Sequence, residues 1–231
     1  MLQSNPVSQQ FRTLLTLSCL LLFGLALAAQ PAVEWAQAYG GSFGDTPRTV
    51  LATADGGYLA GGMTLSYNDD ITNNNGQGDG WLIKVDGQGS LSWSANYGGT
   101  GQDEIKKIIS ANDGGFIVAG YKTNVTNNKS DFWLFKINAS GNITWEETFG
   151  GTGFDTGVDL ISTQDGYLLL GHSNSPDFIR NGYRGQTDAV LLKVNNNGNQ
   201  IWGRRWGGSA NDFTTAVHRL NNGRIVVSGY A

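Results

Sequence analysis

Short apolar runs, separated by turns rich in glycine and asparagine, fill most of the chain after residue 40. In one representative stretch the runs are Ile105–Ser110, Phe116–Ala119, Phe132–Ile137 and Ile143–Phe149. The turns between them include NDGG at 112–115 and NASG at 138–141. Such runs and turns are typical of β-hairpins, because glycine adopts positive φ and Asn or Asp bonds its own backbone. No window with the 3.6-residue period of an amphipathic helix interrupts them, so the pattern predicts an all-β fold.

The apolar runs belong to an internal repeat. Tryptophan recurs at Trp35, Trp93, Trp145 and Trp202, at intervals of 58, 52 and 57 residues. An aromatic-Gly-Gly triplet follows each tryptophan, and then come the acids Asp45, Asp103, Asp155 and Asp212. The third run of each unit opens with Asp79, Asp131 or Asp188. Linked repetition at this many positions indicates tandem copies of one small structural unit.

Each unit reads as four short strands, and four strands in about 50 residues are typical of a β-propeller blade. We predict a propeller-type domain over 29–231, with units at approximately 42–99, 100–151 and 152–208 and a partial unit at 209–231. A β-solenoid is the second choice, because its units are usually shorter. Val33–Tyr39 is expected to be a strand of the fourth type, while the last unit lacks a third strand. About three and a half blades suggest a fragment of a longer propeller, and a distorted four-bladed ring is the alternative.

The pattern D-x-W-L-x-K-[VI]-[DN]-x-x-G-x-x-x-W-x-x-x-[YF]-G-G-[ST] resembles the propeller repeats of large secreted bacterial proteins. Its central part, residues 136–145, is also similar to the tryptophan-docking repeat of quinoprotein dehydrogenases and, more loosely, to the Asp-box hairpin of sialidases. The resemblance covers 33–231 and implies that Trp93, Trp145 and Trp202 pack between neighbouring blades. It implies no particular function, since neither quinoprotein cofactor residues nor a sialidase arginine cluster can be matched here.

The N-terminal segment resembles a secretory signal peptide. Arg12 precedes the apolar run Leu14–Leu27, which ends in a small-x-small motif at Ala26 and Ala28. We predict a signal peptide at 1–28 and an exported protein that is periplasmic, cell-surface or secreted, with no membrane insertion after cleavage. A retained anchor is opposed by the shortness of the run. Lipidation at Cys19 is opposed by the apolar residues that follow it.

Composition narrows the classes of partner. The chain has 34 glycines, 4 prolines and a formal net charge of −4 among 231 residues, and its basic residues form no run. Nucleic acid is therefore not expected as a partner, whereas protein or glycan partners remain plausible. The single cysteine lies in the predicted signal peptide, so the exported domain must be stable without disulfides.

The acids offer no evident catalytic site. Asp45, Asp103, Asp155 and Asp212 recur in every unit, whereas a catalytic residue is normally needed once, so we assign them to turns and loops as backbone acceptors. His172 and His218 occupy positions that are aromatic or aliphatic in other units, and no cysteine accompanies them, so no metal site or other cofactor is predicted. A structural calcium ion is considered for the oxygen-rich loop at 67–80, although the loop departs from the usual calcium-loop spacing.

The units differ mainly in the loop between their second and third runs, which is longer in the first and third units. Insertions in repeat proteins gather on one face, often the binding face. The candidate binding residues on these loops are Tyr67, Asp69, Asp70, Asp177, Arg180, Tyr183 and Arg184. We expect a non-enzymatic binding or scaffolding module. The alternatives are a propeller hydrolase or lyase with a top-face site, and a truncated fragment of a larger cell-surface propeller protein.

Overall fold

The computed structural model of the chain describes residues 33–231, so the predicted signal peptide at 1–28 lies outside it. Residues 37–231 form one compact unit, and residues 33–36 lie outside it. The described part contains 14 strands and no helix, which confirms the all-β prediction. Accordingly, residues 33–231 hold no helix that could cross a membrane.

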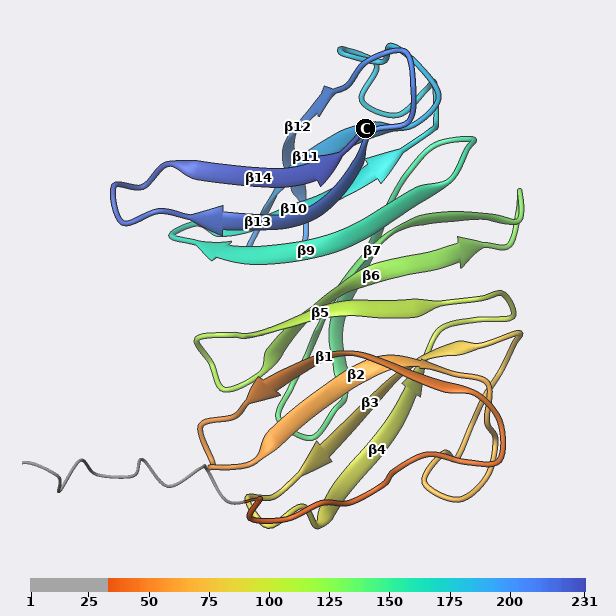
Figure 1. Cartoon of the computed structure of the whole chain (residues 1–231), viewed down its shortest axis with the longest axis vertical. Helices are drawn as coiled ribbons and strands as arrows, with labels where there is room; N and C mark the ends of the chain where they lie inside the picture. The colour runs from red at the N-terminus through yellow and green to blue at the C-terminus, as the bar shows by residue number, and fades with distance from the viewer. Residues whose placement is uncertain (1–32) are drawn as a thin grey trace, which may run out of the picture. The chain divides into compact units, whose positions relative to one another are not determined.

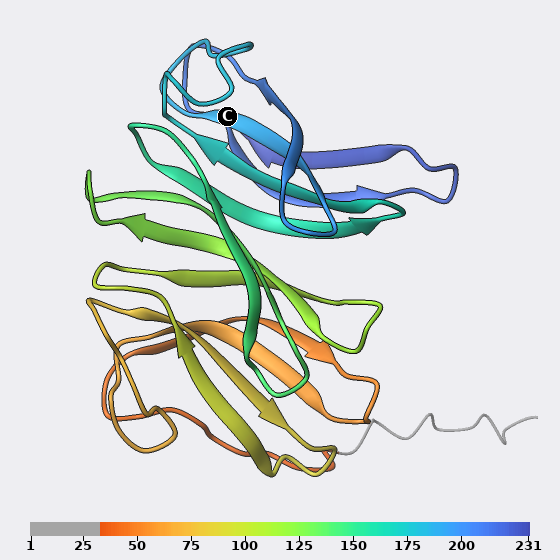
Figure 2. The ribbon, with the colours of Figure 1, turned by 180° about the vertical axis from the view of Figure 1, so that it is seen from behind.

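The strands form three four-stranded antiparallel sheets and one two-stranded sheet (Figures 1 and 2). The first sheet contains β1 (Asp45–Ala52), β2 (Tyr58–Thr64), β3 (Asp79–Val85) and β4 (Leu91–Tyr97). The second contains β5 (Glu104–Ser110), β6 (Phe116–Asn124), β7 (Lys129–Ile137) and β8 (Ile143–Phe149). The third contains β9 (Asp155–Thr163), β10 (Gly166–Ser173), β11 (Asp188–Asn195) and β12 (Gln200–Trp206), and the last contains β13 (Phe213–Arg219) and β14 (Ile225–Tyr230). In each sheet the spatial order follows the chain, and no sheet closes on itself within the residues described.

The predicted hairpins of the second unit are confirmed, and two of the strands, β6 and β7, are longer than expected. β6 and β7 continue past the apolar run until Asn124 pairs with Lys129. A turn closes there because the Asn128 amide donates to the Asn124 carbonyl at 2.8 Å and Asn128 itself has φ of 57°. The first and third units replace this short hairpin with long loops between β2 and β3 and between β10 and β11.

The prediction of a strand at Val33–Tyr39 is wrong, since residues 33–41 form no strand. In each complete sheet the fourth strand pairs with the third, and in the described residues the last sheet has only two strands. A segment with the sequence of a fourth strand forms no strand here, because no third strand lies beside it to share backbone hydrogen bonds. Tyr39 nevertheless keeps the local role of its equivalent: its hydroxyl donates to the Gly89 carbonyl, as the Tyr97 hydroxyl does to the Gly141 carbonyl at 2.6 Å.

Apolar side chains fill the space between consecutive sheets. The third strands are buried on both faces, so alternate residues serve two neighbours. Trp133 and Phe135 belong to the cluster shared with the first sheet, whereas Phe132 and Leu134 belong to the cluster shared with the third. Each fully buried side chain of this size contributes about 2–3 kcal/mol of burial free energy. This apolar burial stabilises the fold in the absence of disulfides.

Candidate functional site

The first long loop, between β2 and β3, bonds mainly to the turn that precedes its own sheet. The Asp70 carboxylate accepts a hydrogen bond from the Gly40 amide at 3.0 Å. The Tyr67 ring is 65% exposed and lies 5.1 Å from the Phe43 ring. Asp69 has φ of 61° and accepts a hydrogen bond from its neighbour Asn68 at 3.2 Å. Of the three predicted binding residues here, Asp70 therefore serves the loop itself, and Tyr67 and Asp69 face outward.

The second long loop, between β10 and β11, behaves in the same way. The Asp177 carboxylate accepts from the amide and hydroxyl of Thr152 at 2.9 and 3.0 Å. The amide hydrogen bond, together with the charge of Arg180, lowers the pKa of Asp177. Each loop thus holds the turn before its own sheet, and no hydrogen bond or ion pair joins the two loops among the described residues.

Two further predicted residues support an internal arginine. The Tyr183 ring lies 4.4 Å from the guanidinium of Arg205, and the Arg184 amide donates to Asp188 at 3.2 Å. Arg205 is fully buried and bonds to the Asp188 carboxylate at 2.8 Å. The guanidinium also donates to the carbonyls of Ser173, Ser175 and Phe178. Arg205 therefore links the β10–β11 loop to the third sheet through these hydrogen bonds.

The recurring acids at the first strands bond to backbone amides in all four units. The side-chain oxygens of Asp45, Asp103, Asp155 and Asp212 accept from the amides of Gly41, Gly99, Gly151 and Gly208 at 2.8, 2.6, 2.8 and 2.7 Å. The first glycine of each triplet lies against the same acid: a Cβ at Gly98 would lie 2.8 Å from Asp79 Oδ1 and still closer to Asp103 Oδ2. Two carboxylates therefore flank this glycine at each junction between units.

Burial is the main influence on these paired carboxylates. It raises the pKa of Asp79 and of Asp131, and the negative charges of Asp103 and Asp155 raise them further. A raised pKa beside a second acid is also a feature of catalytic dyads. Here, however, the arrangement occurs at successive junctions, at Gly98, Gly150 and Gly207. We therefore regard the pairs as part of the repeat.

The tryptophans that recur in the fourth strands contact the next unit where one is present. Trp93 donates from Nε1 to the Ala139 carbonyl at 3.2 Å, beside the β7–β8 turn. Trp145 lies against the β11–β12 turn, close to Gly198, with its ring 6.4 Å from that of Tyr167. Trp202, which has no such turn beside it among the described residues, is 39% exposed.

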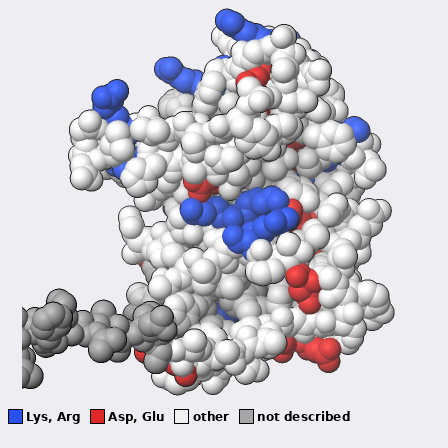
Figure 3. All heavy atoms as spheres, viewed as in Figure 1, with Lys and Arg blue, Asp and Glu red and all other residues white. Residues whose placement is uncertain are grey.

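A group of charged residues on the first strands does not recur in all four units, and we call this group the charge cluster. Figure 3 shows basic side chains grouped over β5 on the face viewed there. Arg48 of β1 and Lys106 of β5 both bond to the Glu104 carboxylate, Lys106 at 2.7 Å. Lys107 bonds to Asp159 of β9 at 2.9 Å. The cluster therefore contains three cations and two carboxylates.

The carboxylates of the charge cluster are buried, whereas its cations reach solvent. Glu104 and Asp159 have side-chain exposures of 5% and 9%, against 46% for Arg48, 23% for Lys106 and 38% for Lys107. Burial opposes ionisation of Glu104, but hydrogen bonds from Lys106 and Arg48 outweigh it and lower its pKa. The exposed side of the cluster is thus positive, with both acids neutralised beneath it.

A β-bulge explains why the sequence did not reveal this cluster. The pairing of β5 with β6 skips Lys106, between Ile105 and Lys107, and the pairing of β1 with β2 skips Arg48. A bulge re-aims side chains away from strict alternation. The cluster was also hidden by separation along the chain. Arg48, Lys106 and Asp159 belong to three different units and come together only when these units pack. A signal was available, since these charges break the repeat at positions where other units have Val158 and Thr215.

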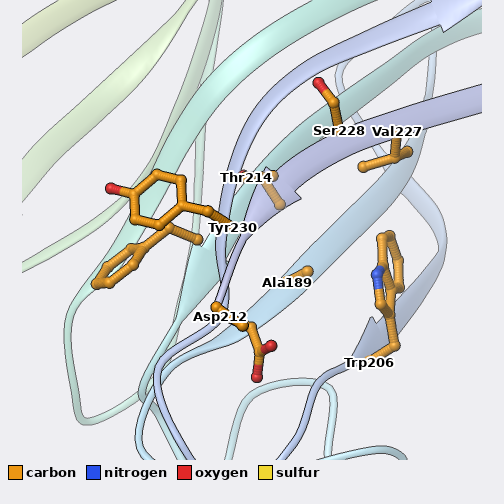
Figure 4. Close-up of a pocket in the computed structure, with 10 residues that line it drawn as sticks. Ala189, Trp206, Asp212, Thr214, Val227, Ser228 and Tyr230 are labelled. Carbon is orange, nitrogen blue, oxygen red and sulfur yellow. The ribbon is translucent and has the colours of Figure 1, made fainter.

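A pocket of ≈ 270 Å³ lies at the last sheet (Figure 4). In this view Trp206 and Tyr230 stand on opposite sides of it, with Ala189 and Thr214 between them. Thr214 is 5% exposed, and its hydroxyl has no hydrogen-bond partner among the described residues. Apolar and aromatic residues line most of the pocket, together with the carboxylate of Asp212 and the hydroxyls of Ser228 and the unpaired Thr214.

The described residues contain no group of three or more His, Cys, Asp or Glu side chains arranged to hold a metal ion. No protein-family model and no curated protein matches the chain.

Proposed function

We propose that the chain is an exported, propeller-type repeat module that binds an acidic ligand without catalysis. The order of strands within each sheet and the packing of each first strand on the preceding sheet support the propeller-type arrangement. The N-terminal sequence supports export. The ligand class follows from the charge cluster, which offers exposed cations on a chain that is negative overall.

The observation that carries the proposal is the neutralisation of both acids in the cluster. A general acid needs a pKa near the working pH and a reachable proton. The pKa of Glu104 is lowered, and its oxygens are occupied by Arg48 and Lys106. Asp159 is occupied by Lys107 and by the amides of two residues of β9 and β13. The site is thus suited to holding an anion, and a hydrolase or lyase is less well supported.

Binding of acidic and neutral oligosaccharides to the mature chain, measured by calorimetry, tests this function. Lys106→Gln and Lys107→Gln together should weaken binding of an acidic oligosaccharide about tenfold or more, since each removes one exposed cation. Arg219→Gln and Arg224→Gln together are the charge-matched control, because both residues are exposed, at the end of β13 and in the β13–β14 turn, outside the charge cluster. Equal binding of neutral and acidic oligosaccharides, or equal weakening by the control, would contradict the proposal. Turnover of any oligosaccharide would favour the enzyme.

A further inference from the structure

A polar pocket of ≈ 390 Å³ lies beside the short β6–β7 hairpin of the second unit. Its walls come from the end of β6, the start of β7 and the second half of β8, and they include Asn124, Asp131 and Thr148. The pocket therefore belongs to one unit in the middle of the chain, and it shares no residue with the charge cluster.

The long loops of the first and third units cover the surface that corresponds to this pocket. In the first unit Ile71 of the loop packs on Trp81 of β3. In the third unit Ile179 of the loop lies against Gly203 of β12, the counterpart of Glu146, which lines the pocket. The second unit has no such loop, because β6 turns directly into β7. The pocket is thus the space that a loop covers in the other units.

In the third unit an arginine of the chain lies at the corresponding position. Arg205 on β12 is the counterpart of Thr148 on β8, because each pairs with the residue two positions after the recurring aspartate of the third strand. The Arg205 guanidinium bonds to the Asp188 carboxylate at 2.8 Å and to three carbonyls of β10 and the loop. In the second unit the same acid is present as Asp131, but threonine brings no charge to it.

Asp131 is consequently a buried carboxylate without a cation of its own. It is 7% exposed, its Oδ2 accepts from the Asn124 side-chain amide at 3.0 Å, and its Oδ1 has no hydrogen-bond partner among the described residues. Lys122, the cation that lines the pocket, bonds instead to Glu146 at 2.7 Å. Glu147 also lines the pocket and forms no ion pair within the described part of the chain. The lining therefore carries three carboxylates and one ammonium group, and its net charge is negative.

We propose that this pocket binds a guanidinium group from outside the chain, in the position that Arg205 has in the third unit. A guanidinium presents its N–H donors in a planar fork, which can bond to a carboxylate and to carbonyl oxygens at once. The carbonyls that Arg205 uses have counterparts at Lys122 and Asn124 on the pocket wall. Pairing the buried Asp131 favours binding, because an uncompensated buried charge is costly. The inference does not depend on the charge cluster or on its acidic ligand.

Methylguanidinium chloride is the probe, and N-methylurea is its neutral counterpart of similar shape. Titration of the isotope-labelled mature chain, followed through amide NMR shifts, should give saturable changes at Asn124, Asp131 and Thr148 with methylguanidinium. N-methylurea should bind about tenfold or more weakly, because hydrogen bonds between charged groups are the stronger ones. Absence of saturable binding, or equal affinity for the two compounds, overturns the proposal.

Two substitutions of carboxylates separate the pocket from the general charge of the chain. Asp131→Asn should weaken methylguanidinium binding about tenfold or more, since it removes the charge that pairs with the ligand. Asp165→Asn removes the same charge in the β9–β10 turn, outside the pocket, and should leave the affinity unchanged. Equal weakening by both variants contradicts the assigned site.

Thr148→Arg supplies the guanidinium from within the chain, as Arg205 does in the third unit. This variant should no longer bind methylguanidinium, and its urea denaturation midpoint should be higher than that of the parent. It also decides the assignment if Asp131→Asn fails to fold, because affinity equal to that of the parent would contradict the proposed position.

N-acetylarginine amide distinguishes the two sources of such a group. Tighter binding of this compound than of methylguanidinium would indicate an arginine side chain of a polypeptide, whereas equal or weaker binding would indicate a small guanidinium compound. Either result supports the pocket as a guanidinium site, provided that Asp131→Asn weakens it.

Discussion

The two glycines of the Tyr97-Gly98-Gly99 triplet have different physical roles, although the sequence presents them as a pair. Gly98 has φ of 149° and is flanked by the carboxylates of Asp79 and Asp103. Gly99 donates its amide to Asp103 at 2.6 Å, and a Cβ added to it would meet nothing within 4 Å. In this triplet Gly98 is required for conformation and space, whereas Gly99 supplies only a backbone amide.

Gly98→Ala should therefore destabilise the fold by about 2–4 kcal/mol, the sum of a strained backbone and a displaced carboxylate. Gly99→Ala, one residue away, should change the free energy of unfolding by less than about 1 kcal/mol. Urea denaturation of the two variants and the parent gives both values. Equal losses at the two positions would mean that the carboxylates do not confine Gly98.

His172 gives the fold a dependence on pH. Burial and the charge of Lys106 lower its pKa to about 4, and its ring lies edge-on to Phe213 at 5.0 Å. A histidine with a depressed pKa contributes stability above its unfolded pKa of about 6.5 and loses it as the pH falls toward 4. His172→Phe should remove this loss, so the parent should lose about 2 kcal/mol relative to the variant between pH 7 and pH 4.

Thermal unfolding at several pH values measures the difference, with His218→Gln as the control for an exposed histidine. Parallel pH profiles for the parent and His172→Phe would show that the imidazole is not desolvated.

At the scale of the elements, the tryptophan of each fourth strand depends on the turn of the next unit. Trp145→Ala removes the contact with the turn at Gly198 and with Tyr167, which should cost about 2–4 kcal/mol. Trp202→Ala should cost less than about 1 kcal/mol, because that ring is 39% exposed. Denaturant midpoints of the two variants provide the comparison. A cost at Trp202 equal to that at Trp145 would mean that the indole stabilises its own strand rather than the junction.

The strands and their order could be predicted because each depends on neighbours close in sequence. The hairpins follow from turn residues such as Gly114 and Gly141, both with φ of 83°. The charge cluster was not predicted: the sequence marks its charges as departures from the repeat, but bulges and packing between units decide that they meet. For Val33–Tyr39 the local pattern predicted a strand that does not form. Its sequence resembles a fourth strand, but a strand also needs a neighbouring strand to pair with. Local patterns therefore predicted the units, and contacts between units determined the site.

For the molecule as a whole, stability comes from junctions between successive sheets. The second sheet contributes to the apolar clusters on both of its faces, one shared with the first sheet and one with the third. The last sheet packs on one neighbour through the smaller cluster that contains Val217 and Leu191. In repeat proteins stability is approximately a sum of unit and junction terms, so units with fewer junctions open first.

This difference predicts uneven hydrogen exchange along the chain. The amides of β14 that bond to β13 should exchange on the order of a hundredfold faster than those of β6 and β10, because opening the last sheet disrupts one junction and leaves the other two intact. Val226 and Tyr230 in β14 are 47% and 64% exposed, whereas Leu169 and Leu170 in β10 are fully buried. Exchange followed by mass spectrometry at peptide resolution gives both rates in one experiment, with β6 as the internal reference. If β14 and β6 instead exchange at one common rate, the chain unfolds as a single cooperative unit and the junctions are not independent.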